Sequence, residues 1–223
     1  MNSDVKGWQA AGVLRFLDRV IPEAPGRPDL AGPDHPMRKV TRQIAEGGGW
    51  DRERAAKVAE LFDGLAPEWH LRGSPERLEP LEDALARGDV GSGVCVEVGS
   101  GTGIATPLLA GAFDLVVAVD LSMEMLVRAP AEPGPRVLAD AARLPLPDRS
   151  ADAVVLLNAF LFPAEVDRVL RPDGAVVWVS AVGDRTPIWL PPDDVVAALP
   201  GEWSGVGADA GWGSWVVARK SLA

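Results

Sequence analysis

The sequence predicts an α/β fold in which a mostly parallel sheet of seven strands is closed by a C-terminal antiparallel hairpin. Three observations predict it. Residues 94–98 are an apolar run, β-branched at three of five positions, that breaks into a glycine-rich turn before an apolar helix start. One helix later a second apolar run ends at Asp120, and such strand–helix–strand units pair in parallel. Residues 151–157 are almost continuously hydrophobic, as in a parallel strand covered on both faces.

Composition narrows the class of partner. The chain has 223 residues, which is enough to bury a core, and a formal net charge of −10. No basic stripe offsets that charge, so we expect a small-molecule substrate, or a protein, and neither nucleic acid nor an anionic membrane. Cys95 is the single cysteine and lies inside the first core strand. With no signal-peptide core and no apolar run of about 18 residues, the sequence predicts a soluble cytoplasmic protein.

The first third of the chain is predicted to be a helical extension. Residues 8–20 show an apolar residue at every third position, which favours one amphipathic helix. Residues 22–36 contain five prolines and are predicted to be an extended connector. His35 lies in that connector, and we expect an exposed loop histidine without a catalytic role. The apolar residues at three-residue steps are Ala11, Leu14, Leu17 and Val20.

Two more helices are predicted before the core, over residues 37–46 and from a cap at Asp51 to Gly64. Ser74 and Pro75 form a clean helix start, and that helix should end near Gly88. The predicted organisation is therefore an N-terminal helical extension, which also serves as a lid, over residues 1–73, and a core over residues 74–223.

The glycine-rich turn predicts a ligand site. Gly99, Gly101 and Gly103 stand at alternate positions, where residues without Cβ permit positive φ and a close approach of backbone to ligand. A dinucleotide fingerprint needs glycine where this chain has Ile104. The carboxylate of Glu97 would repel a pyrophosphate but would attract a ligand that carries a sulfonium and an ammonium. The charge therefore favours S-adenosylmethionine as the cofactor.

The segment Val96-Glu-Val-Gly-Ser-Gly-Thr-Gly103 resembles the glycine-rich motif of class I S-adenosylmethionine-dependent methyltransferases. This resemblance implies a Rossmann-like seven-stranded sheet with helices on both faces, a C-terminal antiparallel hairpin, and methyl transfer as the activity. It also implies that the motif residues bind the cofactor. Those residues are Glu97, Gly99, Ser100, Gly101 and Gly103.

Asp120 ends the second strand, at the edge of the sheet where ligands of such folds bind, so we expect it to accept both ribose hydroxyls. Its 21-residue distance from Gly99 suits a dinucleotide equally well and does not discriminate the cofactor. The segment from Asp120 to Leu126 also matches the methyltransferase pattern. By that resemblance Leu121 and Met123 contact adenine.

The third and fourth strands, residues 135–140 and 151–157, end in further polar residues. By resemblance Asp140 and Ala141 recognise adenine, and Asn158 lies beside the methyl group. The residues after Asn158 do not form the Asn-Pro-Pro-aromatic signature of amide or base-nitrogen methylation. The sequence also lacks carboxylates placed for a catalytic magnesium, so no metal site is predicted.

The segment from Phe62 to His70 resembles the one that forms part of a lid over the cofactor in methyltransferases of the quinone-biosynthesis type. By that resemblance Trp69 contacts the cofactor. The alternative is that Phe62 and Trp69 are packing residues between helix and core. His70 is the one candidate for a catalytic base, and a bystander role is its alternative.

The fifth strand, residues 175–181, and strand-like runs at 202–208 and 212–218 complete the predicted sheet. Four C-terminal tryptophans are expected to be packing residues, and the one with substrate contact as its alternative is Trp189, in the loop after the fifth strand; the four are Trp189, Trp203, Trp212 and Trp215. The predicted function is direct in-line methyl transfer from S-adenosylmethionine, with S-adenosylhomocysteine as the product. Two alternatives stay open: a non-catalytic module that binds these nucleosides for regulation or assembly, and a nicotinamide oxidoreductase, which Glu97 and Ile104 disfavour.

Overall fold

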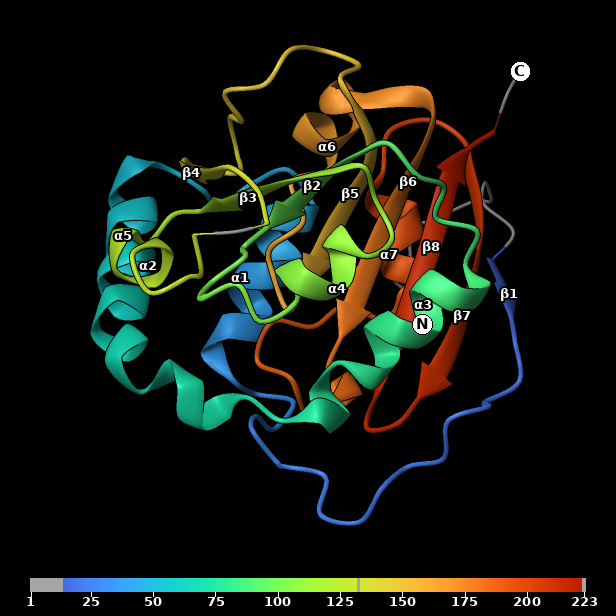
Figure 1. Cartoon of the computed structure of the whole chain (residues 1–223), viewed down its shortest axis with the longest axis horizontal. Coiled ribbons are helices and arrows are strands. Elements are labelled where there is room, and N and C mark those ends of the chain that lie inside the picture. Colours follow the sequence, from blue (N-terminus) through green and yellow to red (C-terminus); the bar gives the residue numbers. More distant parts are fainter. Residues whose placement is uncertain (1–13, 132, 222–223) are drawn as a thin grey trace, which may run out of the picture.

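A computed structural model describes residues 14–131 and 133–221, which form an eight-stranded sheet with helices on both sides (Figure 1). The strand order is β1-β7-β8-β6-β5-β2-β3-β4. The strands are β1 (Leu14–Phe16), β2 (Val94–Val98), β3 (Leu115–Asp120), β4 (Arg136–Leu138), β5 (Ala151–Leu157), β6 (Leu170–Ser180), β7 (Trp203–Ala210) and β8 (Gly213–Lys220).

The predicted fold class is confirmed. β2 lies between β5 and β3 and pairs in parallel with both, and β4 and β6 continue the parallel sheet on either side. β8 runs antiparallel to both β6 and β7, which is the predicted closing hairpin. Because the carboxyl ends of parallel strands share one edge, the residues that follow β2, β3, β4, β5 and β6 are brought together there.

The predicted helix over residues 8–20 is wrong where the structure describes it, and its first part lies outside the described residues. Leu14 to Phe16 form strand β1, which pairs in parallel with β7 and adds an eighth strand to the predicted seven. The edge of β7 offers unpaired backbone groups, and β1 pairs with them from Leu14 opposite Gly205 to Phe16 opposite Gly207. Pairing with a distant strand thus overrides the local apolar period.

Alternate residues of the central strands face two separate cores. On one side Val96 and Val98 join a cluster that α1 (Pro36–Ala45), α6 (Pro163–Val169) and α7 (Pro192–Ala198) cover. On the other side Cys95 joins a cluster beneath α3 (Glu79–Arg87) and α4 (Thr106–Ala110). Both faces of the parallel strands are therefore buried, as their near-continuous hydrophobic sequences predict.

Two of the predicted helix starts have different outcomes. Asp51 caps α2 (Arg52–Leu65) by accepting a hydrogen bond from the Arg54 N–H at 2.8 Å, as predicted. The helix predicted from Ser74 is split into a 3₁₀ turn, η2 (Pro75–Arg77), and α3, and Ser74 makes no capping hydrogen bond. A second 3₁₀ segment, η1 (Ala66–Arg72), links α2 to this turn.

The connector between β1 and α1 is fastened across the carboxyl edge of the sheet (Figure 1, blue). The Trp212 indole N–H donates to the Ala24 carbonyl at 2.7 Å. The Arg27 guanidinium donates to the Val182 carbonyl at 2.6 Å and to the Asp184 carboxylate at 2.5 Å. Since Val182 and Asp184 follow β6, these bonds hold the N-terminal segment against the loops where a ligand is expected.

None of the helices in the described part of the chain is both long and apolar enough to cross a membrane. Within residues 14–131 and 133–221, no three His, Cys, Asp or Glu side chains converge where they could hold a metal ion.

Candidate active site

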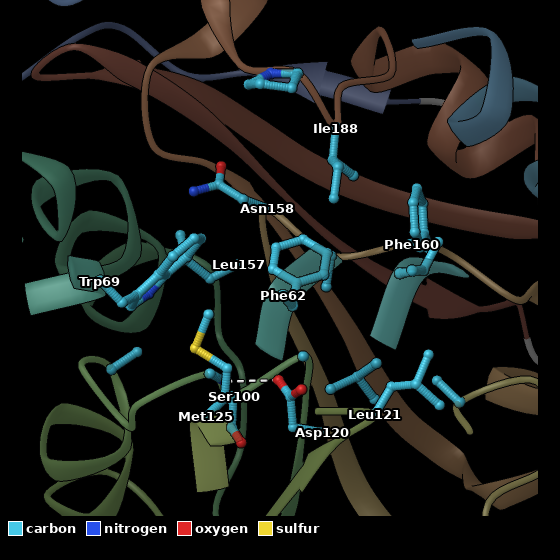
Figure 2. A pocket seen from close by; sticks show the side chains of 18 of the residues that line it. Phe62, Trp69, Ser100, Asp120, Leu121, Met125, Leu157, Asn158, Phe160 and Ile188 are labelled. Carbon is cyan, nitrogen blue, oxygen red and sulfur yellow. Dashed lines mark hydrogen bonds between the residues drawn. The ribbon is translucent and has the colours of Figure 1, made fainter. Parts of the chain in front are cut away.

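A cavity of about 430 Å³ lies at the carboxyl edge of the sheet. Residues that follow β2, β3, β4, β5 and β6 line it, together with parts of the connector, α2 and η1. Figure 2 shows side chains from these distant segments pointing into one space, with Phe62 at its centre. The volume and mixed lining are those of a small-molecule pocket.

The glycine turn after β2 needs its glycines. Gly99, Gly101 and Gly103 have φ values of 69°, 57° and 76°, in the left-handed region that disfavours other residues. A Cβ on Gly99 would meet the Ala159 Cβ at 2.7 Å, because the turn packs against the loop that follows β5. The turn therefore needs glycine at these positions, and Gly99 and Gly101 present backbone without a side chain to the pocket.

Asp120 holds this turn in place. Its carboxylate accepts hydrogen bonds from the Gly101 N–H at 2.7 Å (Figure 2, dashed line) and from the Ser122 N–H at 2.8 Å. Burial raises the pKa of Asp120, and the hydrogen bonds from the Ser122 and Gly101 backbone oppose that shift. The carboxylate oxygens keep unused lone pairs that face the pocket, so Asp120 can still accept hydrogen bonds from a ligand.

Glu97 is a buried carboxylate that has no cation beside it among the described residues. It is 3% exposed, lines the pocket, and accepts one hydrogen bond, from the Thr106 hydroxyl at 2.6 Å. Burial raises the pKa of Glu97 to about 7, against the lowering effect of the Thr106 hydrogen bond, and nearby Asp120 raises it further. A buried carboxylate in this state has much to gain from a cationic ligand.

Ser100 supplies a second sign of a missing partner. Its hydroxyl is buried at the pocket wall and makes no hydrogen bond within the described residues. Buried polar groups in proteins are normally paired, so an orphaned hydroxyl here points to a ligand that completes it. The Glu97 carboxylate, the Ser100 hydroxyl and the backbone of the glycine turn together fit a ligand that has an ammonium and further polar groups.

Asp140, after β4, has a partner that the sequence did not reveal. The Trp50 indole N–H donates to its two carboxylate oxygens at 3.1 and 3.0 Å, and the Ala142 N–H donates to one of them at 2.9 Å. The Trp50 ring also packs against Phe160 at 5.7 Å and Phe162 at 5.2 Å between ring centroids. An aromatic residue between α1 and α2 thereby fixes the carboxylate predicted to read adenine.

Asn158, at the end of β5, is one of the few non-glycine residues with positive φ, at 53°. Asparagine tolerates this conformation better than most residues. Its amide oxygen accepts a hydrogen bond from the Ala181 N–H at 2.9 Å, which fixes the orientation of the amide. The two N–H donors of the side chain remain for the pocket (Figure 2).

Most of the predicted cofactor residues are brought together. The pocket is lined by Trp69, Glu97, Gly99, Ser100, Gly101, Asp120, Leu121, Asp140, Ala141 and Asn158.

Three predicted residues do not line the pocket. Gly103 lies behind the turn, where a Cβ would meet Pro130 and Thr106 at 3.3 Å. Met123 is 49% exposed, because Ser122 caps α5 (Met123–Leu126) in a phase that turns Met125 inward instead.

His70 is also absent from the lining. It lies exposed on η1. The expectation that it reaches a substrate is therefore not met in this structure.

The sequence also missed residues that the pocket contains. His35, predicted to be a bystander, lines it, and so does Trp50. Trp189, for which substrate contact was the alternative to packing, lies against the Arg38 guanidinium at 5.0 Å, while its neighbour Ile188 lines the cavity. No local signal distinguishes these residues, because long-range contacts of the connector and the loops decide which of them point inward.

The comparisons with known proteins agree with this geometry. Residues 96–178 match the model of a methyltransferase domain family. A demethylmenaquinone methyltransferase of Mycolicibacterium vanbaalenii is 33% identical over 135 residues, which cover 54% of this chain and 58% of that protein. An uncharacterized methyltransferase of Mycobacterium tuberculosis is 39% identical over 125 residues, or 52% and 49% of the two chains. The chain thus spans about half the length of these curated relatives.

A solved structure described as a DhpI–SAH complex superposes with a TM-score of 0.62 at 22% identity, covering 76% of this chain and 98% of that one. At this identity the likeness shows the fold alone. Together with the family match, it confirms the resemblance to class I methyltransferases inferred from the glycine-rich motif.

Proposed function

We propose that the chain binds S-adenosylmethionine and transfers its methyl group to a small molecule, because residues 96–178 match the model of a methyltransferase domain family and lie in a mostly parallel sheet with a closing antiparallel hairpin. The observation that carries the proposal is Glu97. A buried carboxylate that has no cation beside it in the described part of the chain, at the foot of a glycine turn and open to the cavity, suits the ammonium of this cofactor.

The amino-acid end of the cofactor would lie between Glu97 and Arg77. Arg77 lines the cavity and forms no ion pair within the described residues, and burial together with the neighbouring Arg72 lowers its pKa. The segment before Arg77 packs against the end of the glycine turn: a Cβ on Gly73 would lie only 3.1 Å from the Ile104 side chain. We assign the ammonium to Glu97 and the carboxylate to Arg77, so that each charge of the zwitterion neutralises an unpaired group.

The nucleoside part of the cofactor would lie across the ends of β3 and then β4. Asp120 after β3 would accept the ribose hydroxyls, and Asp140 and Ala141 after β4 would meet the adenine edge. Leu121 and Met125 would form the apolar contacts of the base. We thus assign to Met125 the adenine contact that the resemblance implied for Met123.

The cofactor supplies a methyl group on a sulfonium whose thioether is already a good leaving group. The protein then has to align the acceptor and keep water out, and alignment provides most of the rate. Phe62 and Trp69 line the cavity and pack edge to face with 5.8 Å between ring centroids, so they would shield the bound cofactor from water. His70 is not placed to act as a base, so no covalent intermediate and no side-chain base is assigned.

A non-catalytic binding module is the competing function. The cavity lining extends past the cofactor groups to residues that follow β5 and β6, which leaves room for an acceptor and favours catalysis. The acceptor of the curated relatives is not carried over, because this chain matches only 58% of the length of the first of them.

Titration calorimetry of the purified protein with S-adenosylhomocysteine and with NAD tests the proposal. We expect binding of the nucleoside and no binding of NAD, together with weaker binding in Glu97→Gln. Tight NAD binding without a response to S-adenosylhomocysteine would falsify the assignment. Binding without transfer of label from S-adenosylmethionine to any compound in an extract of small molecules would favour the binding module.

A further inference from the structure

The charges that line the cavity are unevenly distributed. The three carboxylates stand at the ends of β2, β3 and β4, and the two guanidiniums come from the η1–η2 region. The lining that follows β5 and β6, together with the connector, carries no carboxylate or guanidinium. The charged residues are Glu97, Asp120, Asp140, Arg72 and Arg77, and the apolar side chains of the uncharged half include Leu30, Met37, Phe160, Phe162 and Ile188.

The strand order places the two halves side by side. β5 and β6 lie on one flank of β2, and β3 and β4 lie on the other. Figure 2 shows Asn158 and Ile188 on one side of Phe62, and Asp120, Leu121 and Met125 on the opposite side. If the cofactor spans the ends of β2, β3 and β4, as proposed above, the uncharged half is left for the acceptor.

Two side chains in this half offer unused polar groups. Asn158 accepts a hydrogen bond from the Ala181 N–H through its amide oxygen, which fixes the amide and leaves both of its N–H donors unpaired among the described residues. His35 accepts a hydrogen bond from the Met37 N–H through Nδ1 at 3.2 Å, as the cap of α1, so the proton of the neutral ring lies on Nε2. Thr186 is 2% exposed, and its hydroxyl is hydrogen-bonded to the Ser180 hydroxyl at 3.0 Å. His35 and Asn158 therefore each offer an unpaired N–H donor to this half.

From this arrangement we propose that the uncharged half binds an apolar acceptor through an oxygen atom, which accepts hydrogen bonds from His35 Nε2 and the Asn158 amide. The inference rests on the proposed function for the position of the acceptor. A ketone, phenol or enol oxygen satisfies both donors. A cationic amine has no lone pair to offer, finds no carboxylate in this half, and would be repelled by the sulfonium.

His35 is then a residue that positions the acceptor and selects it, and it is not a base. Its Nε2 already carries the proton, and Nδ1 is engaged with the backbone. Its place is built into the fold, since Arg27 fastens the same connector to Val182 and Asp184 after β6. The two tasks of His35, capping α1 and donating into the cavity, fall on different nitrogens.

This separation gives a clean pair of variants. In His35→Asn the amide oxygen stands where Nδ1 stood and keeps the cap, but no atom reaches the position of Nε2. In His35→Ala both tasks are lost. His70→Asn is the matched control, because His70 is exposed and outside the cavity lining.

The probes are three two-ring compounds of the same skeleton: 1-tetralone, which has a ketone oxygen, 1-aminotetralin, which is a cation at neutral pH, and tetralin, which has no polar group. Calorimetry at pH 7.5 with and without saturating S-adenosylhomocysteine gives their dissociation constants. The unfolding midpoint and the dissociation constant of S-adenosylhomocysteine are measured on the same samples.

We expect the wild-type protein to bind 1-tetralone at least about tenfold more tightly than 1-aminotetralin or tetralin. His35→Asn should weaken ketone binding about threefold to tenfold, with an unchanged midpoint and unchanged S-adenosylhomocysteine binding. His35→Ala should lose the same affinity and also a few degrees of midpoint, and His70→Asn should match the wild type.

Three results would overturn the proposal: no ketone binding at about 1 mM, equal or tighter binding of the amine, or full ketone affinity in His35→Asn. If S-adenosylhomocysteine fails to bind the wild-type protein, the proposed function fails. The ketone titration without it still decides the role of His35, so the two failures are distinguishable.

Discussion

The Trp50 indole N–H donates to both carboxylate oxygens of Asp140, at 3.1 and 3.0 Å, across a separation of 90 positions in the sequence. This hydrogen bond ties the segment between α1 and α2 to the end of β4. The N-terminal third therefore contributes directly to the part of the cavity assigned to adenine.

Trp50→Phe keeps a ring against Phe160 and Phe162 but removes the N–H. Asp140 then loses one charge-assisted hydrogen bond and some of its fixed orientation, and we expect S-adenosylhomocysteine to bind about threefold to tenfold more weakly in calorimetry. Trp189→Phe is the control, because Trp189 packs on Arg38 outside the cavity lining. Equal affinity in both variants would mean that Asp140 does not depend on Trp50.

Asp120→Ala should weaken binding of S-adenosylhomocysteine about tenfold or more, since hydrogen bonds to a charged group contribute about 1.5–3 kcal/mol. The variant also frees the Gly101 and Ser122 N–H groups, so a lower unfolding midpoint is expected. An analogue without the 2′-hydroxyl separates the two effects: the wild type should prefer the full ribose, and the variant should not. Asp114→Ala, exposed just before β3, is the control. A ribose preference that survives in Asp120→Ala would place the ribose elsewhere.

The affinity for S-adenosylhomocysteine should depend on pH through Glu97. Because burial raises its pKa to about 7, the ligand-free protein holds a proton there at pH 6, which an incoming ammonium must displace. Calorimetry should show an association constant that rises about fivefold to tenfold between pH 6 and pH 7.5. Glu97→Gln should bind more weakly and lose most of this rise. The same slope in both proteins would assign the proton to another group.

The same shift has a consequence for stability. A carboxyl whose pKa is higher in the folded state than its ordinary value of 4.5 binds its proton more tightly when folded. Its contribution to the free energy of unfolding is therefore largest below pH 4.5 and is lost as the pH rises to about 7. Denaturant titrations should show this loss in the wild type relative to Glu97→Gln. A wild-type free energy of unfolding that rises with pH relative to that of Glu97→Gln would contradict this prediction.

We predict that the segment from Phe62 to Trp69 is a lid that becomes ordered over the cofactor. Hydrogen exchange of residues 60–72 should slow when S-adenosylhomocysteine is added. Asp63 already links this segment to α5, accepting hydrogen bonds from the Ser122 hydroxyl and the Glu124 N–H, so exchange should slow most beyond it.

Trp69→Ala should weaken cofactor retention and spare the unfolding midpoint of the ligand-free protein, since Trp69 is only half-buried. Unchanged exchange with ligand, combined with a large loss of stability in Trp69→Ala, would make Trp69 a packing residue instead.

The positions of the glycine turn and of the carboxylates at the ends of β3 and β4 could be predicted from the sequence alone. These features depend on residues close together in the chain, and on the rule that parallel strands present their carboxyl ends at one edge. The sequence therefore predicts Gly99, Asp120 and Asp140 in one site, and in the structure all three line the cavity.

Only the tertiary structure decided which side chains of the flanking segments face that site. Met123 and Met125 lie about 200° apart around their helix, so the start of α5 at Ser122 alone turns one outward and the other inward. No pattern in the sequence sets that phase.

His35 and Trp50 reach the cavity, and Leu14 to Phe16 form a strand, through contacts with residues far along the chain. Such placements result from many weak long-range interactions that override local preference. For this reason the sequence was sufficient to predict a cofactor, whereas the donors that we assign to the acceptor became visible only once the connector was seen crossing the sheet edge.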